Sequence, residues 1–198
     1  MNKFCVYLVS ILFYLYSSAF AYNTNPKEFV SELVNDAISK LSDKNVNKDE
    51  KAIFIEKIAL ENVDIYALGL YTLGELRKSS DEQTLGKYQE AFEKYFLKTL
   101  TSRLTDYSSS KFEVLAEDKK SSNYTIVSSR VLPTDGGPEI KIDWRIYTKN
   151  PNKPLVRDLI VEGLSLARTQ KEEFASILNS NNNDINFLIN KLIEFVNN

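Results

Sequence analysis

Hydrophobic residues in the first half of the chain recur with the period of an amphipathic helix, about 3.6 residues. This pattern predicts a helix over residues 26–41 and a second helical region over residues 48–76. A third helix is predicted over residues 80–107. The second region contains residues that weaken a helix, so we expect it to break near Asn62 or Gly69.

The start of the first helix has a strong local signal. Asn25 can accept hydrogen bonds as an N-cap, Pro26 suits the first helical turn, and Glu28 stands at the capping-box position. These three residues predict a helix that begins at Pro26.

The hydrophobic period changes to two in the middle of the chain, which is typical of half-buried strands. The predicted strands are residues 112–116, 124–132, 140–147 and 155–164. Turn residues separate the last three at 134–138 and 150–154. Two further helices, over residues 166–178 and 184–196, complete the pattern. We therefore predict an α+β fold: a four-stranded antiparallel meander sheet covered by N-terminal and C-terminal helices.

The N-terminus has the features of a secretory signal peptide. Lys3 is followed by a largely apolar stretch over residues 4–16, which is too short to span a membrane. Ala19-Phe20-Ala21 then matches the A-x-A cleavage pattern. A retained anchor is the alternative, but the short run and the cleavage site favour removal of residues 1–21. We expect export to the periplasm and one domain over residues 22–198.

Composition excludes several kinds of chemistry. The chain has no histidine, and its single cysteine, Cys5, lies in the predicted signal peptide. The common metal-ligand sets, a disulfide and a Ser-His-Asp triad are therefore excluded from the exported part. Acidic and basic residues number 27 and 25 and are mixed along the chain, which argues against nucleic-acid binding. We predict no catalytic residue, no metal and no cofactor.

Residues 163–167 superficially resemble a G-x-S-x-G nucleophile elbow. Because no histidine can activate it, Ser165 is better interpreted as the cap of the following helix. Asp158 and Glu162 would lie about 13 Å apart along one strand, too far to act on one bond. We interpret Asp158 as part of an ion pair or turn, and Glu162 as part of a bend with Gly163.

Three arginines, Arg130, Arg145 and Arg157, fall on predicted strands. They could meet a phosphate group. The favoured interpretation is that they form ion pairs across the sheet, with Asp143, Asp158 or Glu162 as the partners.

Residues 158–174 contain a D-x-x-x-E-G-[hydrophobic]-S pattern followed by a T-x-[RK]-x-x-F helix. This combination resembles a signature of the MlaC/toluene-tolerance family of periplasmic phospholipid carriers. Residues 64–96 match a second family segment at Asp64, Leu73, Gly74, Glu82, Gln83, Tyr88, Ala91 and Phe92. Residues 135–144 resemble its hairpin. Lys171 stands where the family usually has arginine, and Gln170 often aligns with an aromatic residue.

The resemblance implies a soluble, monomeric shuttle whose cargo is phospholipid. Such proteins carry glycerophospholipid between an outer-membrane lipoprotein complex and an inner-membrane ABC transporter with an MCE-domain subunit. It also implies an apolar cavity between sheet and helices that holds the acyl chains. The candidate lining residues are Leu73, Phe92, Tyr95, Phe96, Leu100, Ile140, Ile142, Trp144, Ile160 and Leu164. Tyr95 and Tyr107 are candidates for its rim.

Other interpretations stay open at this point. Each lining candidate has the periodicity of an ordinary core residue, because periodicity reports burial and not a cavity. The whole chain could instead be an adaptor without a pocket that bridges envelope proteins. A small-molecule enzyme on a similar scaffold is a third possibility, but the sequence offers no cluster of groups for it.

Overall fold

The structure is a computed structural model and describes residues 22–105, 110–134 and 136–198. The predicted signal peptide, Tyr107 and Asp135 lie outside these residues. No helix within the described ranges is long and apolar enough to cross a membrane. The same ranges contain no group of acidic residues that could hold a metal ion.

The first half of the chain is helical, as the hydrophobic period predicts. The helices are α1 (Pro26–Ser42), α2 (Lys48–Asn62), α3 (Ile65–Thr72), α4 (Leu76–Ser79) and α5 (Glu82–Leu104). Helix α1 begins at Pro26, and the side chain of Asn25 accepts hydrogen bonds from the backbone N–H groups of Lys27 and Glu28. A complete capping box occurs at α2, between Asn47 and Glu50.

The predicted break in the second helical region lies at Asn62, where α2 ends. The chain is extended at Val63, and Asp64 then caps α3 through a hydrogen bond from the backbone of Ala67. Gly69 does not break a helix but lies within α3, where its lack of a side chain allows close contact with α5.

The second half contains a sheet followed by two helices. The strands are β1 (Ser110–Lys119), β2 (Tyr124–Pro133), β3 (Ile140–Tyr147), β4 (Leu155–Val161) and β5 (Leu164–Ser165). They pair in strict sequence order as an antiparallel meander. Helices α6 (Leu166–Asn179) and α7 (Ile185–Asn197) follow. The α+β prediction is confirmed, with one short strand more than predicted.

The fifth strand arises from a tight hairpin at Glu162 and Gly163. Both residues have positive φ, 49° and 82°, as a type I′ turn requires at its two central positions. Val161 and Leu164 pair directly on either side of this turn. The bend predicted at Glu162 is therefore confirmed, and it ends β4 at Val161 rather than at Leu164.

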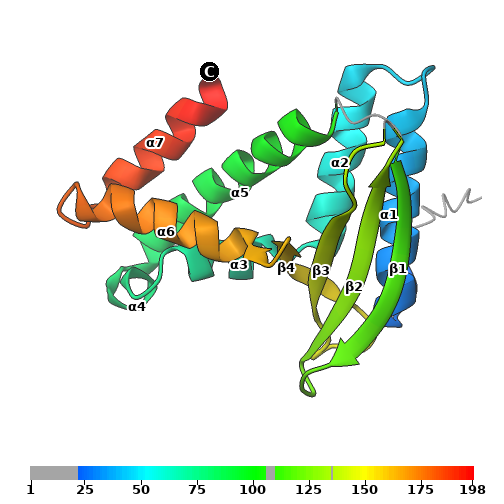
Figure 1. The fold of residues 1–198 in the computed structure, drawn as a ribbon. Helices are drawn as coiled ribbons and strands as arrows, with labels where there is room; N and C mark the ends of the chain where they lie inside the picture. Colours follow the sequence, from blue (N-terminus) through cyan, green and yellow to red (C-terminus); the bar gives the residue numbers. More distant parts are fainter. Residues whose placement is uncertain (1–21, 106–109, 135) are drawn as a thin grey trace, which may run out of the picture.

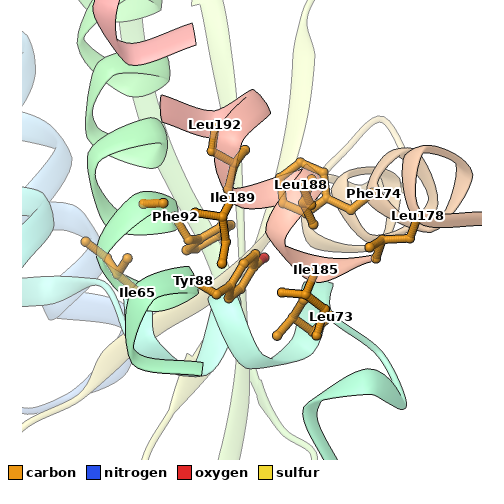
Figure 2. Close-up of a cluster of buried hydrophobic side chains, with 11 residues drawn as sticks. Ile65, Leu73, Tyr88, Phe92, Phe174, Leu178, Ile185, Leu188, Ile189 and Leu192 are labelled. Atoms are coloured by element: carbon orange, nitrogen blue, oxygen red, sulfur yellow. The ribbon is translucent and has the colours of Figure 1, made fainter. Parts of the chain in front are cut away.

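The described residues form two hydrophobic clusters. Figure 1 shows how the helices and strands that contribute to them are arranged. In one, α1 lies along the sheet, and Phe29, Val30 and Leu33 pack on Val127, Ile146 and Val156. In the other, α3, α5, α6 and α7 pack together beside the sheet, which α3 and α6 contact at β4. Figure 2 shows the second cluster, to which α5 contributes Phe92 and α7 contributes Leu188, Ile189 and Leu192. Val63, between α2 and α3, packs against both clusters.

Candidate functional site

The candidate lining residues fall into different parts of this architecture. Leu73 and Phe92 are fully buried in the helical cluster, and Tyr95 and Phe96 pack at its edge. Phe92 stacks on Phe96 with ring centroids 6.2 Å apart. The first two residues are thus closed off by their neighbours, whereas Tyr95 and Phe96 keep part of their surface accessible.

The candidates on β3 lie on the face of the sheet that α1 covers. Trp144 packs at the edge of the sheet cluster, where its ring centroid lies 6.2 Å from that of Phe112. Its Nε1–H donates a hydrogen bond to the hydroxyl of Ser129 at 2.9 Å. Ile142 and Ile140 continue this face beyond the cluster, because side chains two apart on a strand share a face. Ile142 is half-buried and Ile140 is 36% exposed.

Strand pairing extends this apolar face sideways across three strands. Ile142 lies directly opposite Val161 of β4, and Val161 lies directly opposite Leu164 of β5. Directly opposed residues point to the same face of a sheet. We call Ile140, Ile142, Trp144, Val161 and Leu164 the apolar strip. It becomes more exposed toward the edge of the sheet, where Leu164 is 70% exposed.

Helix α5 also supplies Leu100, the last of the candidates on helices. This residue is half-buried and follows Phe96 by four positions, so both side chains lie on one face of the helix. The C-terminal end of α5 leads within a few residues to β1, whose start pairs with the end of β2, next to the start of β3. The topology therefore brings this end of α5 and the strip to the same end of the sheet (Figure 1).

Ile160 differs from the other candidates because it lies on the opposite face of the sheet. There it lines a cavity of about 850 Å³ between the sheet and α3. The cavity is bounded by Ala67, Leu68, Tyr71, Asp118, Lys120, Ser121, Tyr124, Ile126, Ser128, Asp143, Arg145, Arg157, Ile160 and Ala167. None of the other nine candidates lines it. The sequence pattern did not predict this cavity, because its polar residues have the pattern of the solvated face of the strands.

Residues 158–174, here called the signature segment, form a hydrogen-bonded joint between the sheet and α6. The carboxylate of Asp158 accepts from the hydroxyl of Ser165 at 2.6 Å and from the backbone N–H of Ala167 at 3.0 Å. Ser165 in turn caps α6 by accepting from the N–H of Arg168 at 3.0 Å. Both interpretations made from the sequence, a cap at Ser165 and a structural pairing of Asp158, are confirmed.

The partners predicted for the three arginines are correct in one case. Arg145 meets Asp158 at 3.5 Å. Arg130 pairs instead with Glu113 at 2.6 Å and with Glu139 at 3.1 Å. Glu113 is its cross-strand neighbour, because these two residues are directly opposed in the β1–β2 register.

Arg157 pairs with a carboxylate outside the sheet. Its guanidinium donates to Asp64 at 2.8 and 2.7 Å and to the Tyr124 hydroxyl at 2.7 Å, and it stacks 3.4 Å from the centroid of the Tyr147 ring. A bulge in the β3–β4 pairing leaves Arg157 without a cross-strand partner, which explains the wrong prediction. The ion pair between Arg157 and Asp64 connects β4 to the start of α3.

Comparison with known proteins identifies the family. The family model described as MlaC protein matches residues 30–194. The chain belongs to the MlaC family. Among solved structures, it is similar to a phospholipid-binding protein from Ralstonia solanacearum, whose structure was determined in complex with a phospholipid. The two share 18% sequence identity with a TM-score of 0.69, over 84% of this chain and 94% of that one. At this identity the likeness establishes a common fold for this MlaC-family chain.

Proposed function

We propose that this MlaC-family protein binds phospholipid and carries it through the periplasm. The observation that supports this most is the family match over residues 30–194, together with the shared fold of a protein solved with bound phospholipid. The polar groups of the signature segment are engaged with one another, which supports a structural role for them. We infer a binding protein without enzymatic activity.

The acyl chains are proposed to lie against the apolar strip, with Phe96 and Leu100 of α5 as the facing wall. An exposed strip of large apolar residues at a sheet edge is costly in water, and Leu164, at 70%, is its most exposed residue. Each CH₂ group of the lipid that leaves water contributes about 0.8 kcal/mol to binding. Covering the strip removes its exposed apolar surface from water as well, which adds to this free energy. The fully buried candidates Leu73 and Phe92 would support this wall from behind.

The proposed transport route is the one that the resemblance to the MlaC family implies. The protein would leave the cytoplasm by means of the predicted signal peptide and act as a soluble monomer. It would pass glycerophospholipid between an outer-membrane lipoprotein complex and an inner-membrane ABC transporter with an MCE-domain subunit. Phospholipid is then cargo, and no further cofactor is required.

The test is native mass spectrometry of the exported protein, purified without detergent, with extraction of any bound lipid. The proposal expects a stoichiometric adduct of phospholipid mass. Leu164→Asp should remove the adduct while the protein stays folded, because a 70% exposed side chain contributes little to the core. Phe96→Asp tests the helical wall in the same way.

Ile193→Asp is the matched control. Ile193 is also a large exposed aliphatic residue, 43% exposed, but it lies on α7 away from the strip. Its lipid adduct should be unchanged. A folded Leu164→Asp protein that retains its lipid would exclude the strip as the binding surface. A wild-type protein that stays free of lipid even after refolding with phospholipid would favour the adaptor interpretation.

A further inference from the structure

The cavity of about 850 Å³ has no role in the proposed lipid site, because it lies on the other face of the sheet. Asp143 and Arg145, which line the cavity, alternate along β3 with Ile142 and Trp144 of the apolar strip. Neighbouring residues of a strand point to opposite faces. The volume is within the range of roughly 300–1,000 Å³ that is typical of small-molecule sites.

The two walls of this cavity differ in chemistry. Helix α3 contributes Ala67, Leu68 and Tyr71, which form an apolar wall. The sheet contributes charged and hydroxyl side chains, with Ile126 and Ile160 between them. A ligand that satisfies both walls carries polar groups on one side and an apolar body on the other.

Most charges at the cavity already have close partners. Arg157 uses its donors on Asp64 and Tyr124 and is fixed by stacking on Tyr147. Lys120 is paired with Asp118. The opposite charges within each pair neutralise each other, so they attract a charged ligand only weakly.

Asp143 and Arg145 are the exceptions. The structure gives Arg145 one ion pair, at 3.5 Å, to Asp158, whose carboxylate already accepts two shorter hydrogen bonds. Asp143 accepts one hydrogen bond, from the hydroxyl of Ser128 at 2.6 Å. Asp143 and Arg145 are two residues apart on one strand, so their Cα atoms are about 6.7 Å apart. Among the described residues no ion pair joins them to each other.

A ligand with only a negative charge would be repelled by Asp143, and a ligand with only a positive charge would be repelled by Arg145. A group that carries both charges a short distance apart meets a partner for each. We propose that this cavity binds a zwitterionic amphiphile with a single apolar arm, with its anionic group at Arg145 and its ammonium group at Asp143. The apolar arm lies against Leu68 and Tyr71 of α3.

The shared chemistry, an ammonium group beside a phosphate, could come from a whole lysolipid or from a free headgroup. The experiment therefore titrates the delipidated protein, by calorimetry below the micelle concentration, with lysophosphatidylethanolamine, lysophosphatidylglycerol and phosphoethanolamine. Lysophosphatidylethanolamine should bind at least ten-fold more tightly than the other two. Equal binding of the two lysolipids would overturn the assignment to Asp143, and equal binding of phosphoethanolamine would remove the apolar arm from the proposal.

Variants separate this cavity from the apolar strip. Asp143→Asn should abolish the preference for the ethanolamine headgroup, and Arg145→Gln should weaken both lysolipids about ten-fold or more. Arg145→Lys keeps the charge beside Asp158 but loses the forked donors, so it gives an intermediate loss in a folded protein. Lys153→Gln, an exposed charge in a turn, is the control and should change nothing.

Leu164→Asp distinguishes this inference from the proposed function. It should remove diacyl phospholipid from the strip and leave the lysolipid affinity of the cavity unchanged. If Leu164→Asp abolishes both, the lysolipid binds at the strip and the cavity proposal is wrong. If the cavity variants alone have no effect, the same conclusion follows, and the carrier proposal is unaffected.

Discussion

Removal of the Asp158 carboxylate is expected to destabilise the joint between the sheet and α6 more than a typical substitution. The side chain of Asp158 is 1% exposed and accepts from Ser165 at 2.6 Å and from Ala167 at 3.0 Å. Each hydrogen bond to a charged group contributes about 1.5–3 kcal/mol. The contact with Arg145 adds at most about 1 kcal/mol, since its side chain is 44% exposed and water screens the charge.

Asp158→Ala should therefore lower the free energy of unfolding by about 3–5 kcal/mol, in line with the loss of one partner from a buried polar network. For a chain of this size, each kcal/mol shifts the melting temperature by about 2–4 °C, so a decrease of roughly 10 °C is expected. Asp158→Asn keeps the shape and one acceptor oxygen, and should cost about 1.5–3 kcal/mol. The measurement is urea unfolding followed by tryptophan fluorescence.

A double-mutant cycle that combines Asp158→Ala with Ser165→Ala tests this estimate. Ser165→Ala loses the hydroxyl bond to Asp158 and the cap on α6, which together cost about 1–3 kcal/mol. Because the two residues share one bond, the double variant should fall short of the sum by about 0.5–3 kcal/mol. Glu172→Ala, an exposed carboxylate on the same helix, is the control, within about 0.5 kcal/mol of wild type. A loss under about 1 kcal/mol for Asp158→Ala would refute the argument.

Three further outcomes are expected. Burial raises the pKa of the Tyr88 phenol, so the unfolded chain loses that proton first and stability falls as pH rises above about 10; Tyr88→Phe should flatten this decline in unfolding measured against pH. A Cβ at Gly69 would lie 3.0 Å from the ring of Phe92, so Gly69→Ala should cost about 1–3 kcal/mol, whereas Gly86→Ala, with open space around it, should gain about 0.5–1 kcal/mol in thermal unfolding. Trp144 is the only tryptophan and lies on the apolar strip, so titration with phospholipid should shift its fluorescence to the blue; an unchanged spectrum with bound lipid would place the lipid elsewhere.

Much of the architecture could be predicted because local signals and tertiary packing agree. Asn25 and Ser165 stand where caps are needed, and each caps its helix in the structure. The strands over residues 124–133 and 140–147 alternate because one face packs on α1. At such positions local preference and burial favour the same conformation.

The fifth strand was missed because glutamate is an uncommon residue at positive φ. Asn-Gly and Asp-Gly are the usual type I′ pairs, so Glu162-Gly163 read as a bend and not as a hairpin. The partner of Arg157 was missed for a different reason. A bulge in the sheet and contact with Asp64, 93 positions away, are both determined by tertiary structure.

The site was predictable only in part. Apolar period-two residues such as Ile142 and Leu164 could be found from the pattern, and register then places them side by side across β3, β4 and β5. The pattern does not distinguish Phe92, enclosed by the helical cluster, from Leu100, which stays half-buried. That difference depends on how α5 packs against α7, which no local signal encodes.

The strict sequence order of the sheet also affects how quickly its strands can pair during folding. Every strand pairs with its immediate neighbour in the chain, so each hairpin closes a short loop at low entropic cost. Sheets built from such local pairings have low contact order and fold faster than sheets that join distant strands. Under the proposed export, the chain would benefit from this topology after it crosses the membrane, because its unpaired strand edges would stay exposed for only a short time.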